Sequence, residues 1–80
     1  MQEYMKVFEK ISGTATVTHR CARKSNGFAL LNKGASDVTF TINGITITVP
    51  FSTSFEDSFE DFTTVIITVT TAFEAVIKGF

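Results

Sequence analysis

Four carboxylates form the densest charged segment of the chain, in two consecutive Ser-Phe-Glu-Asp units: Glu56, Asp57, Glu60 and Asp61. Carboxylate oxygens are the usual ligands of Ca²⁺, and a bound cation would relieve the repulsion between these like charges. The segment lacks the alternating Asp/Asn pattern and the glycine of an EF-hand loop. A charge run of this kind is typical of a solvated loop, which we favour here, and a metal-dependent regulator that binds Ca²⁺ through these carboxylates is the alternative.

His19 and Cys21 are two residues apart on a predicted strand, so their side chains point to the same side, as a pair of zinc ligands would. They are the chain's one His and one Cys, so a closed structural zinc site cannot be completed from these residue types. A Cys/His nucleophilic pair would need an oxyanion-binding glycine turn beside it, and none adjoins them. We therefore expect no catalytic residue, no metal ligand and no cofactor, and a protein that is not an enzyme.

Arg20, Arg23 and Lys24 form a compact basic patch near Phe28, the one aromatic residue close enough in sequence to stack on a base. The net charge of −1 and the pI near 5.7 argue against nucleic acid as a partner. Charge is also divided unevenly, with +3 in residues 1–37 and −4 in residues 38–80. We expect the basic patch to face the acidic segment of a second copy.

Threonine recurs in pairs separated by one residue: Thr14/Thr16, Thr39/Thr41, Thr46/Thr48 and Thr68/Thr70. A regular threonine lattice can bind ice or a crystalline polymer, but these intervals are irregular. Threonine also suits the wetted face of a strand, which explains most of the pattern. A carbohydrate or cell-surface ligand on such a face is the alternative function, although the chain has no Trp and a single Tyr, Tyr4.

The composition predicts one small soluble domain. The chain has 80 residues, of which 44% are hydrophobic and 19% charged, which excludes disordered and collagen-like chains. A single cysteine excludes a disulfide-stapled miniprotein and fits a reducing compartment. Asn43-Gly44 and Pro50 interrupt the uncharged stretch 38–55, and no apolar leader follows Met1, so we expect neither a membrane span nor a signal peptide.

Alternation of apolar residues with threonine predicts a hairpin over residues 38–49. Asn43-Gly44 suits a two-residue type I′ turn, which pairs Ile42 with Ile45, Phe40 with Ile47 and Val38 with Val49 on one face. The same period predicts a second hairpin over residues 63–79, in which Val69 pairs with Phe73. Further short strands are expected at residues 14–21 and 28–32, separated by a Ser25-Asn26-Gly27 turn. Six short strands favour an all-β fold, a small antiparallel β-sandwich or jelly-roll-like domain over residues 12–80.

Two segments fit more than one structure. Residues 1–11 form an N-terminal arm, in which Tyr4, Phe8 and Ile11 fit a helical stripe, while the alternative is a strand running into Ser12-Gly13. Residues 50–62 place Phe55, Phe59 and Phe62 on one helical face, with Ser54 as a possible N-cap. Either a short helix or a pair of turns over these residues would cover the open end of the sandwich.

The chain has more apolar surface than one small core can cover. It contains nine Phe, and Ile66-Ile67 and Leu30-Leu31 place apolar residues on both faces of their strands. Exposed contiguous apolar surface usually marks an interface, so we expect a homo-oligomer. The expected interface residues come from the arm, the basic patch and the Phe/acid segment: Tyr4, Phe8, Ile11, Arg20, Arg23, Lys24, Phe55, Glu56, Asp57, Phe59, Glu60, Asp61 and Phe62.

The order of turns and strands resembles small β-rich virion proteins of bacteriophages. The resemblance covers residues 27–79 and rests on Gly27-Phe28-Ala29-Leu30-Leu31-Asn32-Lys33-Gly34, on Asp37-Val38-Thr39-Phe40-Thr41-Ile42-Asn43-Gly44 and on Val49-Pro50-Phe51-Ser52-Thr53-Ser54-Phe55. It implies a head decoration, fibre or tail accessory protein that self-associates and docks on larger capsid or tail proteins. It also implies a virion location after assembly in the host cytoplasm, and it supplies no catalytic residues; the charge balance and the residue pattern argue against nucleic acid and a membrane as partners.

Overall fold

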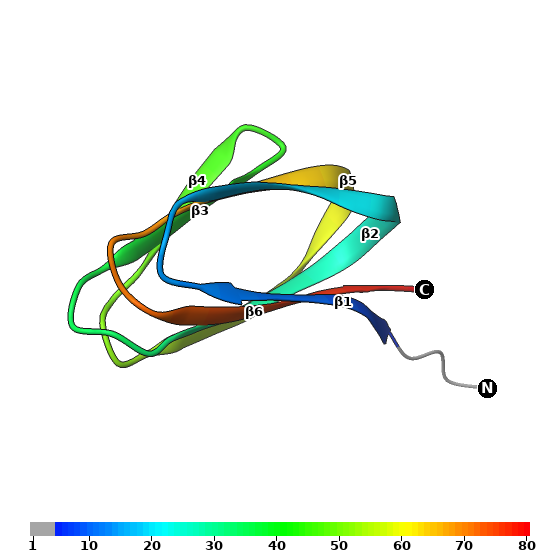
Figure 1. The fold of residues 1–80 in the computed structure, drawn as a ribbon. Coiled ribbons are helices and arrows are strands. Elements are labelled where there is room, and N and C mark those ends of the chain that lie inside the picture. Colours follow the sequence, from blue (N-terminus) through cyan, green and yellow to red (C-terminus); the bar gives the residue numbers. More distant parts are fainter. Residues whose placement is uncertain (1–4) are drawn as a thin grey trace.

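The computed structural model describes residues 5–80 and confirms the all-β class (Figure 1). Its six strands are β1 (Lys6–Gly13), β2 (Val17–Asn32), β3 (Val38–Ile42), β4 (Ile45–Val49), β5 (Ser54–Thr68) and β6 (Phe73–Gly79). No helix occurs in this part of the chain, and hence none that is long and apolar enough to cross a membrane.

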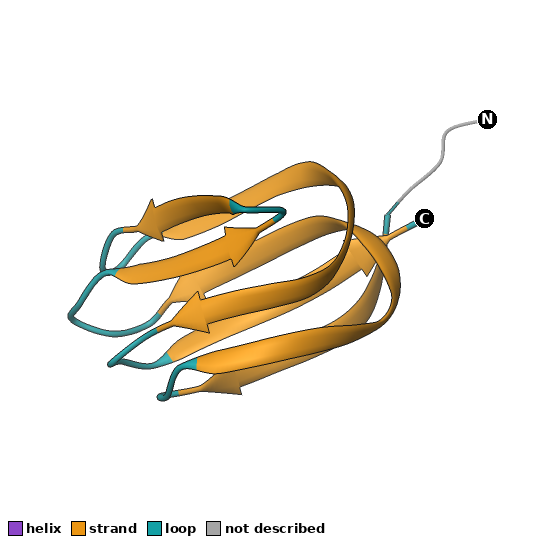
Figure 2. Ribbon diagram, turned by 90° about the horizontal axis from the view of Figure 1, so that it is seen from above, coloured by secondary structure: helices purple, strands orange, loops and turns teal. Residues whose placement is uncertain are grey.

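One antiparallel sheet contains all six strands, in the order β1-β6-β2-β5-β3-β4. The long strands β2 and β5 pair twice with each other, residues 17–20 with 64–67 and residues 27–31 with 54–58. Between these stretches the register shifts from Arg20 to Ser25 and again to Gly27, and there both strands curve round, as Figures 1 and 2 show. The sheet therefore folds over on itself.

Two layers result from this folding. The β6 layer contains β1, β6, the C-terminal half of β2 and the N-terminal half of β5. The β3 layer contains the N-terminal half of β2, the C-terminal half of β5, β3 and β4. Since β2 and β5 belong to both, the layers are parts of one hydrogen-bonded surface.

Apolar side chains from both layers form the core. The buried hydrophobic residues are Phe28, Leu30, Val38, Phe40, Ile42, Val49, Phe62, Val65, Ile67, Val69, Phe73, Ala75 and Ile77. The Phe28 ring from the β6 layer lies 4.6 Å, centroid to centroid, from the Phe40 ring of the β3 layer. Phe55 and Phe59 extend this aromatic contact along β5. Tilted and edge-on ring pairs add attraction beyond their buried area, so this cluster holds the layers together.

The β3–β4 hairpin is confirmed with the expected register. Val38 pairs with Val49, Phe40 with Ile47 and Ile42 with Ile45. Both turn residues have positive φ, 52° at Asn43 and 77° at Gly44. This is the conformation of a type I′ turn, whose twist matches that of the strands.

The predicted hairpin over residues 63–79 is wrong. β6 lies between β1 and β2, and β5 lies between β2 and β3, so Val69 does not pair with Phe73. Both residues are buried, but the connection between β5 and β6 leads from one layer to the other, so each reaches the core from a different layer. Alternation identifies which side chains face the core, but it does not identify the neighbouring strand.

The turn expected at Ser25-Asn26-Gly27 is also wrong, because β2 continues through it. Ser25 is fully buried, its hydroxyl donates to the carbonyl oxygen of Arg23 at 3.1 Å, and the chain bends without reversing. The two strands predicted at residues 14–21 and 28–32 are therefore one strand. This merger reduces the six predicted strands to five, and residues 6–13 form a sixth strand that was not among them.

The helical alternatives are wrong at both ambiguous segments. Residues 54–62 belong to β5, so neither a helix nor a pair of turns forms from Ser54 onward. Residues 6–13 form β1, which confirms the alternative of a strand running into Ser12-Gly13. Tyr4 lies outside the described residues.

Candidate functional site

The outer edge of β4 is an open sheet edge. In a two-residue hairpin the residues flanking the turn exchange both backbone hydrogen bonds, and the pattern alternates from there. Ile45, Ile47 and Val49 therefore direct their backbone groups to β3, while those of Thr46 and Thr48 point away from the sheet. β4 has β3 as its one strand neighbour among residues 5–80. These outward donors and acceptors can pair with a strand of another molecule.

Within residues 45–49, β4 has no charged side chain, bulge or proline to block such pairing, and Pro50, directly after Val49, limits the pairing to this stretch. No charged residue occurs between Val38 and Phe55, and the β3–β4 register contains no bulge. Large apolar side chains flank the edge, since Ile45 at one end of β4 is 55% exposed and Phe51, just beyond the other end, is 57% exposed. Charges, bulges and prolines on edge strands are what normally prevent strand addition. The β4 edge is therefore open to a partner strand.

The edge at β1 is protected by comparison. β1 contains Lys6, Glu9 and Lys10, and its pairing with β6 shifts register between Val7 and Glu9. The Glu9 side chain also spans to β2, where its Oε2 accepts a 3.0 Å hydrogen bond from the backbone N–H of Ala22. Charge, bulge and this contact all disfavour a further strand at β1.

The basic patch and the acidic segment lie on the neighbouring strands β2 and β5 of one chain, at different positions along them. Arg20, Arg23 and Lys24 are exposed on β2 at its bend, and β5 carries the four carboxylates on the adjacent strand. Asp61 accepts a hydrogen bond from the Asn26 side chain, and Glu56 forms an ion pair with Lys78. Within residues 5–80, the basic patch forms no ion pair with the four carboxylates.

The aromatic and arm residues expected at an interface pack largely within the chain. Phe62 is buried, Phe55 and Phe59 are half-buried against the core, and Ile11 packs on the same core. Phe8 is half-buried and lies beneath the Arg23 guanidinium, whose carbon is 4.1 Å from the ring centroid. The quadrupole of an aromatic ring attracts a cation that lies over its face. This contact therefore also stabilises the position of β1 against the bend of β2.

Glu9, His19 and Cys21 bring three potential metal-ligand atoms together beside that contact. One ligand atom from each residue lies within 4.8 Å of the other two, and all three residues are half-buried. The Nε2 atom of His19 is 2.9 Å from Oε1 of Glu9. The sequence indicated the His19/Cys21 pair, but it gave no signal that a carboxylate from residues 6–13 would reach it.

Groups around the cluster hold its members in place. The Ala22 N–H binds the Glu9 oxygen that does not contact His19, so both carboxylate oxygens are engaged. Burial raises the pKa of the Cys21 thiol, a hydrogen bond with the Ser25 side chain opposes this, and the negative charge of Glu9 adds to the rise. In the metal-free protein the thiol therefore keeps its proton at neutral pH.

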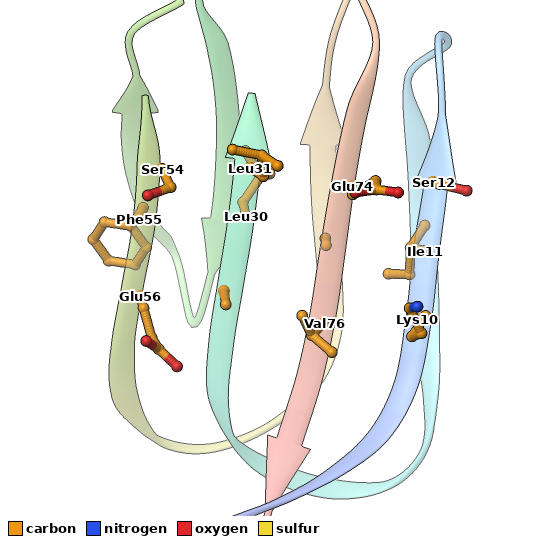
Figure 3. Close-up of a pocket in the computed structure, with 12 residues that line it drawn as sticks. Lys10, Ile11, Ser12, Leu30, Leu31, Ser54, Phe55, Glu56, Glu74 and Val76 are labelled. Carbon is orange, nitrogen blue, oxygen red and sulfur yellow. The ribbon is translucent and has the colours of Figure 1, made fainter. Parts of the chain in front are cut away.

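The outer face of the β6 layer contains a shallow groove of about 470 Å³ (Figure 3). Leu31 and Val76 lie in it between the charged side chains of Lys10, Glu56 and Glu74. The sequence signal for this surface was the presence of apolar residues on both faces of these strands. The groove is wide open and holds no cluster of catalytic groups.

The outer face of the β3 layer is rich in threonine. Strand pairing places Thr46, Thr41, Ile66 and Thr18 in one row across four strands, and Thr48, Thr39 and Thr68 in the next. The hydroxyl oxygens of Thr41 and Thr46 are 2.8 Å apart. The Thr39/Thr41 and Thr46/Thr48 pairs thus form a compact array on one surface together with Thr18 and Thr68.

No protein-family model, no curated protein and no solved structure matches this chain.

Proposed function

We propose that this protein is a structural component that self-associates through β4 and docks on a bacteriophage capsid or tail assembly. The open edge of β4 is the observation that carries self-association. The virion setting rests on the resemblance of residues 27–79 to small phage virion proteins. In such a setting the protein acts by assembly, without catalysis.

A second copy fits the β4 edge by pairing its own β4 in the antiparallel direction. The outward backbone groups of Thr46 and Thr48 in one copy then bind those of the partner, and a two-fold axis makes the contact self-complementary. The β3 layers of both copies become one continuous sheet. Pairing at this edge also brings the exposed Ile45 and Phe51 of each copy near the contact, where burial of one such side chain contributes about 1.5–3 kcal/mol.

The test is the oligomeric state of a variant that lacks one outward donor. Thr48→Pro removes the N–H that points away from β3, and proline is tolerated at such edge positions because the internal ladder does not use that donor. Native mass spectrometry and light scattering should show an oligomer for the wild type and a monomer for Thr48→Pro. Thr48→Val keeps the backbone N–H, and its side chain is nearly the same size as that of threonine. This variant should therefore remain an oligomer.

Two results would contradict the proposal. A folded wild-type protein that is monomeric at high concentration has no self-association to explain. An oligomer that persists in Thr48→Pro, with an unchanged circular dichroism spectrum, is built through a surface other than the β4 edge. Docking is tested separately, by co-sedimentation of the protein with purified phage capsids and tails.

The threonine array favours a second candidate function, a binding module for a carbohydrate or cell-surface ligand. Its hydroxyls form rows at the spacing of adjacent strands, about 4.8 Å, and offer donors and acceptors to a repeating polar surface. A glycan array that includes insoluble polysaccharides tests this function. Binding that is lost in Thr41→Lys and kept in Ser54→Lys, on the outer face of the β6 layer, would support it, and an array without hits would remove it.

A further inference from the structure

We propose that Glu9, His19 and Cys21 form a binding site for Zn²⁺ at the corner where β1 meets the bend of β2. The site is distinct from the β4 edge and does not depend on the proposed self-association. It combines a carboxylate oxygen, an imidazole nitrogen and a thiol sulfur, which are the ligand types that zinc binds in proteins.

The backbone brings these ligands together from two strands. His19 and Cys21 alternate on β2 with exposed Thr18 and Arg20, so both side chains point to the same side of the strand. Glu9 projects from β1 at the position where the register shifts, and its carboxylate lies 2.9 Å from the imidazole. In a tetrahedral zinc site, oxygen and nitrogen ligands are about 3.4 Å apart, given bond lengths of about 2.0–2.2 Å. The carboxylate oxygen and the imidazole nitrogen would move apart by about half an ångström to reach that geometry, and the thiol sulfur, which lies within 4.8 Å of both, would move closer to them.

Neighbouring groups provide the support that metal ligands require. The Ala22 N–H fixes one Glu9 oxygen at 3.0 Å and leaves the other facing His19. Such outer hydrogen bonds orient the ligands and typically change metal affinity by about 10–100-fold. The contact between Arg23 and Phe8 also holds β1 against β2. Phe8 is next to Glu9 on β1, and Arg23 is two residues beyond Cys21 on β2.

The charges of the site match a divalent ion. A carboxylate and a thiolate together carry two negative charges, and neutral imidazole adds none, so Zn²⁺ gives a neutral cluster. Zinc binds the thiolate, so the ion replaces the thiol proton when it binds. The sulfur and nitrogen ligands favour Zn²⁺ over Mg²⁺ and Ca²⁺, which prefer oxygen ligands. With three protein ligands, the fourth position is left for water.

The experiment uses tag-free, full-length protein that has been treated with a chelator and kept reduced. Titration with Zn²⁺ in a calorimeter should give one ion per chain. Titration with Co²⁺ should give the near-ultraviolet charge-transfer band of a thiolate–cobalt bond together with visible bands of tetrahedral intensity. Zn²⁺ should then bleach both sets of bands by displacing Co²⁺.

Variants separate this site from other carboxylates on the surface. Cys21→Ser and His19→Gln should each lower the Zn²⁺ affinity by at least about 100-fold, more than the loss of an outer hydrogen bond costs. Glu56→Gln removes an equal charge from the exposed ion pair with Lys78 and should leave the affinity unchanged. Backbone circular dichroism of each variant confirms that the fold persists.

Three results would overturn the proposal. One is a folded wild-type protein that gives neither heat with Zn²⁺ nor a cobalt–thiolate band. Another is Zn²⁺ binding that survives both Cys21→Ser and His19→Gln, which would assign the ion to other residues. The third is a loss of Zn²⁺ binding in Glu56→Gln, which would assign it to the acidic segment of β5.

Discussion

The side-chain amide of Asn32, at the end of β2, donates a 3.0 Å hydrogen bond to the carbonyl oxygen of Val49, at the end of β4. The same amide donates to the carbonyl oxygen of Ser36 at 2.8 Å, and its oxygen accepts from the N–H of Gly34 at 3.1 Å. Asn32 is 1% exposed. One buried side chain thus satisfies backbone groups of β4 and of the connection between β2 and β3 at this end of the molecule.

Asn32→Ala should therefore lower the free energy of unfolding by about 2–3 kcal/mol, because it leaves buried backbone groups without partners. Urea denaturation followed by circular dichroism measures this loss. Asn26→Ala is the matched control, since Asn26 bonds an exposed carboxylate and its loss should cost less than about 1 kcal/mol. Equal losses in the two variants would contradict the role given to Asn32.

Phe40→Ala should destabilise the fold by about 3–5 kcal/mol, because Phe40 is fully buried and its ring contacts Phe28 and Phe55. Phe80→Ala removes the same atoms from a position that is 66% exposed and away from the β4 edge, and it should change stability by less than about 0.5 kcal/mol. Thermal and urea unfolding of the two variants give the comparison. A cost of similar size at both positions would mean that the core is misassigned.

Gly44→Ala should lower the unfolding free energy by about 1–2 kcal/mol. The φ angle of 77° disfavours an L-residue, while an added Cβ would have no atom within 4 Å, so the cost comes from the backbone alone. Asn43→Gly keeps the positive φ accessible and should cost less. A stable Gly44→Ala variant would indicate that the turn is not of type I′.

Salt separates edge pairing from docking by charge. At about 1 M salt the Debye length is about 3 Å, so an oligomer held by the basic patch of one copy and the acidic segment of another should dissociate. Pairing through β4 relies on backbone hydrogen bonds and apolar contacts, so the oligomer mass should stay the same. Light scattering over a salt series distinguishes the two. Dissociation in high salt would favour the charged surfaces over β4.

The sequence determines local features well where one short segment contains all the necessary information. Asn43-Gly44 sets both the turn and the register of β3 and β4, because the loop length fixes which residues face each other. The partner of residues 73–79 was mistaken, because pairing with β1 and β2 depends on segments more than 40 residues away. Long-range pairing of this kind leaves no mark on the local pattern.

Ambiguity of period explains the error at Phe55 and Phe59. A spacing of four residues is close to one helical turn and is also two repeats of a strand, so it fits both structures. The register shifts opposite Ser25 then bring Phe62 to the core side of the strand. The polar Ser25-Asn26-Gly27 segment, which is typical of a turn, lies at this bend.

The candidate sites were anticipated in part. The sequence indicated His19 and Cys21 as a pair, but Glu9 joins them through the approach of β1 to the bend of β2, a tertiary contact. The sequence shows the threonine pairs, but only strand pairing shows that Thr39/Thr41 and Thr46/Thr48 share one surface. The open edge of β4 follows from its place at the end of the strand order, which is a property of the whole sheet.

The continuity of β2 and β5 through both layers has a mechanical consequence. A force that pulls the layers apart acts on the peptide bonds of two bent strands as well as on the side chains between them. Separation then requires straightening the backbone at both bends, which also disrupts the pairing on either side. The fold is thus braced by its own covalent chain against loads that would peel two independent sheets from each other.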